Sequence, residues 1–157
     1  MQYPVQIEGF EGQSIVVQAP GFLAGPKLLV NGQPAAKGPK RNQLSLRRND
    51  GMEAVVQWKP RALGLDVPQL LVDGQTVEVV ESLKWYEWLW SALPLVLIFS
   101  GGAIGGLLGA IGLFANIKLF RSSLSNIVKY LATGAVIVAV GVAYAIVAML
   151  VATAVGS

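Results

Sequence analysis

The chain has 157 residues, of which 54% are hydrophobic and only 13% charged, with twelve Lys and Arg against nine Asp and Glu. Ordinary soluble domains are about a quarter charged, so this average indicates two different regions. The absence of His and Cys excludes His-based acid–base catalysis, thiol nucleophiles, disulfides and most metal sites, so we expect no enzyme, no cofactor and no metal.

The charge is divided unevenly along the chain. Residues 1–87 hold all nine acidic residues and nine basic ones, whereas residues 88–157 hold only Lys118, Arg121 and Lys129. The net charge of +3 therefore sits in one short stretch between two apolar ones, and we expect no nucleic-acid partner. We predict an α+β membrane protein: a soluble β domain over 1–83, and a two-helix transmembrane hairpin over 84–157.

Short β-branched runs and Gly-containing turns fill the first domain. A repeat supports this interpretation, because the sequence LLVNGQ at 28–33 returns as LLVDGQ at 70–75. Asn-Gly and Asp-Gly accept the positive φ angles of a two-residue turn, so both segments should form tight hairpins. With no basic segment leading into an apolar core at its start, the chain shows no secretory signal peptide.

A third hairpin is expected around Asn49-Asp50-Gly51. A two-residue turn would mix charged and apolar residues on one face, whereas a three-residue loop pairs Leu44 with Val56 and Leu46 with Ala54. Trp58 lies in the same hairpin, where a large aromatic is usually a core residue rather than a ligand platform. The strands together predict a small antiparallel β-sandwich or barrel.

Two long uncharged stretches follow the β domain. About 20 apolar residues cross a hydrocarbon core roughly 30 Å thick, so we predict membrane spans at about 90–115 and 131–154. Aromatic residues that prefer the headgroup level flank them: Trp85, Tyr86, Trp88, Trp90 and Tyr130. The basic residues that should lie among lipid headgroups and report topology are Lys84, Lys118, Arg121 and Lys129.

Glycines recur every four residues in the first span, at Gly101, Gly105 and Gly109. This pattern resembles the glycine zippers of oligomeric membrane proteins, and Gly102 and Gly106 add a second small stripe. Glycines on one face of a helix leave a groove that another helix can enter. Its two candidate occupants are the second helix of the same chain and a helix of another subunit. Gly134, Gly141 and Ala145 offer a matching small face on the second helix.

Two rules predict opposite orientations of the chain in the membrane. Two spans would return the chain, so both termini should share a side, and the basic loop at 116–129 would be cytoplasmic by the positive-inside rule, with the β domain outside. The missing signal peptide argues for a cytoplasmic β domain. We favour the latter, in a multi-pass protein of the plasma (inner) membrane.

The first functional hypothesis is a small membrane protein that self-associates through Gly- and Ala-rich helices and displays its β domain as an interaction module, a scaffold or an accessory subunit. Its expected partners are membrane lipid, further copies of itself as a homo-oligomer, and another membrane protein. The alternative is a homo-oligomeric channel or pore. Neither span contains an ionisable residue, which argues against ion-coupled transport.

Overall fold

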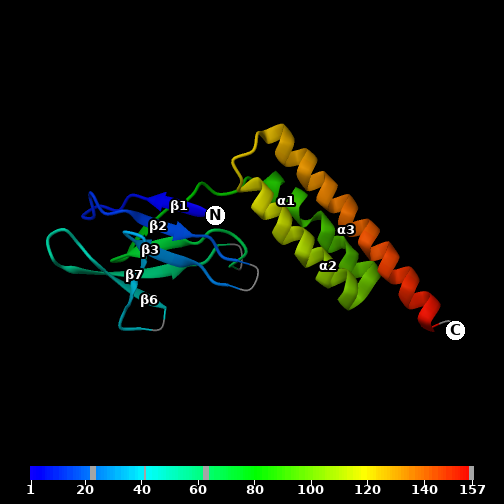
Figure 1. Cartoon of the computed structure of the whole chain (residues 1–157), viewed down its shortest axis with the longest axis horizontal. Coiled ribbons are helices and arrows are strands. Elements are labelled where there is room, and N and C mark those ends of the chain that lie inside the picture. The colour runs from blue at the N-terminus through cyan, green and yellow to red at the C-terminus, as the bar shows by residue number, and fades with distance from the viewer. Residues whose placement is uncertain (22–23, 41, 62–63, 156–157) are drawn as a thin grey trace. The chain divides into compact units, whose positions relative to one another are not determined.

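The computed structural model describes residues 1–21, 24–40, 42–61 and 64–155. The chain divides into two compact units, which we name the β unit, Met1–Ser82, and the helical unit, Leu83–Ser157. Strands make up the first and long apolar helices the second, as Figure 1 shows. This is the α+β layout that the composition predicted.

The described part of the β unit contains two antiparallel sheets. The first has the order β1 (Gln2–Val5), β2 (Ile15–Gln18), β3 (Lys27–Val30) and β4 (Gln33–Pro34). The second has the order β5 (Ala36–Lys37), β6 (Gln43–Arg47), β7 (Glu53–Lys59), β8 (Gln69–Val72) and β9 (Gln75–Val77). Within each sheet, strands that are consecutive in the sequence pair with one another, so the sheets need no crossover connection.

The predicted hairpins are confirmed with their registers. Val30 pairs with Gln33 and Val72 with Gln75, each across a two-residue turn whose central residues have positive φ. In the third hairpin Leu44 pairs with Val56 and Leu46 with Ala54. Gly51 takes the left-handed conformation there, as the three-residue loop required.

Both sheets contribute to one core. Its buried side chains come from the first sheet and the segments beside it (Val5, Ile7, Phe10, Ile15, Val17, Leu28) and from the second sheet and the segment before β8 (Leu46, Ala54, Val56, Val67, Leu70, Val72). Trp58 is half-buried and packs against this core. Two antiparallel sheets around shared apolar residues are thus established, while the finer choice of sandwich or barrel stays a prediction.

Asn49 ties the two sheets together at one end. Its Nδ2 donates to the Glu11 carbonyl oxygen at 2.8 Å, and its Oδ1 accepts from Gln13 Nε2 at 2.9 Å. Its backbone N–H donates to the Gly9 carbonyl at 3.0 Å. The loop after β6 is therefore bonded to the loop between β1 and β2, two segments far apart in the sequence.

The helical unit consists of α1 (Trp85–Ala92), the 3-10 turn η2 (Leu93–Val96), α2 (Leu97–Phe120) and α3 (Asn126–Val155). Pro94 lies at the start of η2, where its missing N–H disturbs no established helical bond. The predicted spans fall inside helical segments, but the first segment is longer than expected at both ends.

Gly102 breaks the first apolar segment in two. Its φ of 51° and ψ of −129° are non-helical, a conformation that residues with a Cβ avoid. Asn116 Nδ2 lies 3.5 Å from the Ser91 carbonyl oxygen, although 25 residues of straight helix would separate these levels by about 37 Å. The chain therefore reverses at Gly102, so residues 90–115 do not form one continuous helix.

We call residues 85–101 the first limb and residues 103–120 the second limb. Figure 1 shows α1 and α2 side by side, with α3 running along them. The Trp90 Nε1 donates to Thr133 Oγ1 at 2.9 Å, and the Tyr144 hydroxyl donates to the Ser100 carbonyl at 2.9 Å. The helical unit is thus a bundle of three antiparallel segments, where the sequence predicted two.

Candidate functional site

The outer surface of the helical unit is strongly apolar. Among the described residues, every exposed large hydrophobic side chain other than Met1 and Met52 belongs to this unit. On α3 alone Leu131 is 69% exposed, Val138 66% and Met149 69%. Monomeric soluble proteins rarely expose contiguous apolar patches beyond a few hundred Å², so this surface is the strongest functional feature of the molecule.

Two helical segments are long and apolar enough to cross a membrane. They are Trp85–Phe120, with a mean hydropathy of 2.0, and Asn126–Ala154, with a mean hydropathy of 2.7. The first reaches that length only by counting both limbs, whereas α3 is continuous. About 20 helical residues cross the hydrocarbon core, and α3 alone exceeds that number.

Gly105 and Gly109 allow the two limbs to touch. An ideal Cβ on Gly109 would lie 2.6 Å from the Pro94 carbonyl oxygen, and one on Gly105 would overlap the carbonyl oxygen of Leu97. Gly112 is equally tight, at 2.9 Å from the Pro94 Cβ. Small residues at helix contacts let backbones approach in this way. The occupant of this part of the groove is the first limb of the same chain, which the glycine spacing did not predict.

The remaining glycines of the first segment have other surroundings. Gly101 faces the ring of Tyr144 on α3, and Gly106 is in ordinary contact with Ile98. Gly102 forms the break, so it belongs to no helical stripe. The glycines of this segment therefore have three different roles: Gly105 and Gly109 lie where the limbs touch, Gly101 makes room for the Tyr144 ring, and Gly102 forms the break.

The small face expected on the second helix is open in the single chain. A Cβ on Gly134 or Gly141 would meet nothing within 4 Å, and Ala145 is exposed. Neither glycine packs against the limbs. The predicted contact between this face and Gly101, Gly105 and Gly109 is therefore not present in the single chain.

Three polar contacts join the segments inside the unit. Ser91, Asn116 and Thr133 are completely buried and take part in the Asn116–Ser91 and Trp90–Thr133 contacts described above, while Tyr144 bonds the backbone beside the break. Hydrogen bonds of this kind bind helices together in lipid. Asn116 lies in α2 and not in the predicted loop. These contacts were not predicted, although isolated polar residues in apolar segments are a signal for them.

The predicted interface aromatics divide between two roles. Trp85 is 76% exposed and Tyr86 is also exposed, with their rings edge to face at 5.8 Å, and Trp88 is half-buried. Trp90 and Tyr130 instead pack between segments, because the Tyr130 ring centroid lies 6.1 Å from Trp90 and 5.2 Å from Phe120. All of them lie toward the same end of the helical unit.

The predicted basic residues gather at that end too. Lys84 precedes α1 and its Nζ lies 5.8 Å above the Tyr86 ring. Lys118 is in the last turn of α2, with its Nζ 4.8 Å above the Phe114 ring. Arg121 is the first residue of the loop between α2 and α3, and Lys129 lies in the first turn of α3.

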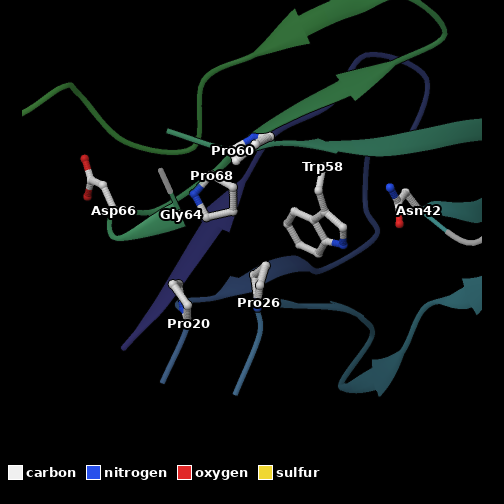
Figure 2. A pocket seen from close by; sticks show the side chains of 8 residues that line it. All are labelled: Pro20, Pro26, Asn42, Trp58, Pro60, Gly64, Asp66 and Pro68. Carbon is white, nitrogen blue, oxygen red and sulfur yellow. The ribbon is translucent and has the colours of Figure 1, made fainter. Parts of the chain in front are cut away.

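The β unit carries an apolar groove of about 290 Å³. Figure 2 shows the Trp58 ring among the prolines, with Pro60 and Pro68 on one side and Pro20 and Pro26 on the other. The lining residues are Pro20, Pro26, Asn42, Trp58, Pro60, Gly64, Asp66 and Pro68. Asp66 is the one carboxylate among them, and its Oδ1 already accepts the Val67 N–H at 2.7 Å. A single engaged carboxylate does not provide the paired groups of general acid–base catalysis.

Metal-ligating and charged side chains are dispersed elsewhere in the structure. Among the described residues, no three Asp or Glu side chains gather into a group that could hold a metal ion. The Arg48–Asp73 ion pair, 2.5 Å between Nη2 and Oδ2, joins the end of β6 to the turn after β8.

Comparison with protein-family models, curated proteins and solved structures finds no match for this chain.

Proposed function

We propose that the protein is an integral membrane protein whose helical unit is embedded in lipid and whose β unit acts as a non-catalytic interaction module, a scaffold or an accessory subunit. The observation that carries this proposal is the apolar outer surface of the helical unit. Burying one exposed Val, Leu, Ile or Phe side chain contributes about 1.5–3 kcal/mol. The exposed set extends from Trp85 to Val151, so lipid is the environment that stabilises this unit.

The interior of the helical unit supports the same proposal. The buried Asn116 amide nitrogen and Thr133 hydroxyl make contacts between segments, whereas the outer face from Leu131 onward is apolar on successive turns. This is the reverse of a soluble bundle, in which polar residues face outward. Lipid as a partner follows from this inversion.

We also propose that the protein self-associates, through a different surface from the glycine pattern of the first segment. Gly105 and Gly109 are occupied by the first limb, so the open face of α3 with Gly134, Gly141 and Ala145 is the surface we assign to a second copy. Small residues on one face allow two helices to approach closely. The mass of the detergent-solubilised particle should exceed that of one chain, and Gly141→Leu should reduce it to one chain.

The pore hypothesis loses its main support. It needed Gly101, Gly105 and Gly109 to pack subunits around a lumen, and the contacts of these residues lie within one chain. Purified protein in liposomes should therefore form stable particles without conductance.

Membrane insertion is tested with Val142, which is 53% exposed near the middle of α3. A charge at the bilayer centre costs at least about 2.5 kcal/mol, so Val142→Glu should reduce the fraction of protein that resists extraction by alkaline carbonate. Val142→Leu is the matched control and should remain in the membrane fraction. Release of the unchanged protein by carbonate would refute the proposal.

A further inference from the structure

The reversal at Gly102 gives the helical unit two unlike ends. The contacts Asn116–Ser91, Trp90–Thr133 and Phe120–Tyr130 place the start of the first limb, the end of the second limb and the start of α3 at one level. Lys84, Lys118, Arg121 and Lys129 all lie toward that level, which we call the basic end. The opposite end contains the turn around Gly102 and the last turns of α3, which carry no charged residue up to Val155.

The depth of each segment can be estimated from its length. Sixteen residues separate Gly102 from Lys118, about 24 Å of helix, whereas Lys129 to Val155 covers about 39 Å. The hydrocarbon core is roughly 30 Å thick. With the basic end at the headgroups, α3 crosses the bilayer, while the limbs enter and return on the same side.

The break fits this arrangement because part of its backbone is bonded inside the protein. A helix end in hydrocarbon leaves carbonyl groups without partners, which is tolerated where the protein supplies them. The Tyr144 hydroxyl donates to the Ser100 carbonyl beside the break. Tyr144 is thus a polar group provided by α3 at the depth where the chain turns.

From this geometry, and resting on the proposed membrane insertion, we propose that the β unit and the loop at 121–125 share the cytoplasmic face, that α3 ends on the opposite face, and that the basic end contacts anionic lipid headgroups. The β unit is covalently joined at residue 83, beside the basic end. In this topology the basic loop and the β unit lie on the same face, which the positive-inside rule makes the cytoplasmic one.

The absence of native cysteine permits a direct test by single-cysteine labelling of the full chain. Met52→Cys reports the β unit, where Met52 is 60% exposed; Ser123→Cys reports the loop, and Ser157→Cys follows α3. An impermeant maleimide should label Met52→Cys and Ser123→Cys only in inverted vesicles, and Ser157→Cys only in intact cells. Labelling of Met52→Cys and Ser123→Cys from opposite faces would overturn the inference, as would Met52→Cys and Ser157→Cys on one face.

Carbonate extraction of the same membranes keeps the two proposals apart. Release into the supernatant refutes insertion itself, whereas retained protein with the wrong labelling pattern refutes only the topology. The triple variant Lys118→Glu/Arg121→Glu/Lys129→Glu reverses three charges at the basic end. In this variant Met52→Cys should be labelled partly in intact cells and partly in inverted vesicles. Lys27→Glu/Lys37→Glu/Lys40→Glu changes the same number of charges in the β unit and should leave labelling unchanged.

A lipid comparison isolates the anionic headgroups. The thermal midpoint of the reconstituted chain should be higher in phosphatidylcholine vesicles containing phosphatidylglycerol than in phosphatidylcholine alone. The difference should vanish in Lys118→Gln/Arg121→Gln/Lys129→Gln. Equal midpoints of the unchanged chain in both lipids would overturn the headgroup contact.

Discussion

Replacing Gly109 by Ala distinguishes a reversed chain from a straight span by the sign of its effect. In a straight apolar helix Ala is favoured over Gly by about 1 kcal/mol. In the reversed chain the new Cβ would lie 2.6 Å from the Pro94 carbonyl oxygen, 3.1 Å from its carbon and 3.2 Å from the Leu95 Cα. These are backbone atoms, so no side-chain rotation relieves the overlap.

The size of the effect follows from the required movement. Bringing the closest contact from 2.6 Å to an ordinary 3.4 Å separates the limbs by about 0.8 Å, and gaps of about 0.5–1 Å forfeit a quarter to a half of the dispersion energy across them. Overpacking of this kind costs about 1–3 kcal/mol. After the helix-propensity gain of about 1 kcal/mol, we expect Gly109→Ala to destabilise the helical unit by up to about 2 kcal/mol.

The assay is SDS titration of the protein in mild detergent, followed by tryptophan fluorescence. Gly106→Ala is the matched control on the same limb, because a Cβ there makes only an ordinary 3.5 Å contact with the Ile98 side chain, and it should leave the midpoint unchanged or raise it. Gly109→Ala should lower the midpoint. If both variants raise it equally, the limbs do not touch and the reasoning fails.

Three further predictions concern single contacts. Tyr144→Phe removes the hydroxyl bonded to the Ser100 carbonyl and should destabilise the helical unit by about 0.6–1 kcal/mol in the same titration, whereas an unchanged midpoint would show that the break needs no such partner. Asn49→Ala removes the side-chain bonds to Glu11 and Gln13 and should cost the β unit about 1–2 kcal/mol in urea unfolding of the full chain; Asn42→Ala, exposed and outside this cluster, is its control. Hydrogen bonds from the Gly9 N–H and, next in size, the N–H of Glu11 itself lower the pKa of the Glu11 carboxyl. The ionised carboxyl therefore stabilises the fold above its ordinary pKa, and this contribution is lost as pH falls through the lowered pKa. Glu11→Gln should flatten the dependence of the urea midpoint on acidic pH, and an identical pH profile would contradict the assignment.

Sequence patterns predicted the β unit well because its signals are local. The Asn31-Gly32 and Asp73-Gly74 dipeptides determine their own turn geometry, and alternation of apolar residues selects the register around Gly51. The link from Asn49 to Glu11 joins residues 38 apart, and nothing in the local pattern announces it. The Trp58 groove depends in the same way on prolines brought together by the fold.

In the helical unit the composition identified the apolar segments but gave the wrong path. Hydropathy counts residues without regard to direction, so a segment that reverses within itself scores like a long span. Glycines at 101, 105 and 109 indicate close backbone contact, yet spacing alone does not identify the occupant. The buried Ser91, Asn116 and Thr133 were the signal that the segment has an inside.

The reversal at Gly102 is tested most directly by the distance between Leu89 and Lys118. Both side chains are exposed, and spin labels at Leu89→Cys and Lys118→Cys are the only thiol adducts in a chain that lacks native cysteine. Packed helix axes lie about 8–10 Å apart, so with the label arms we predict an electron–electron distance of about 25 Å or less. A distance near the roughly 43 Å of a continuous 29-residue helix would contradict the reversal.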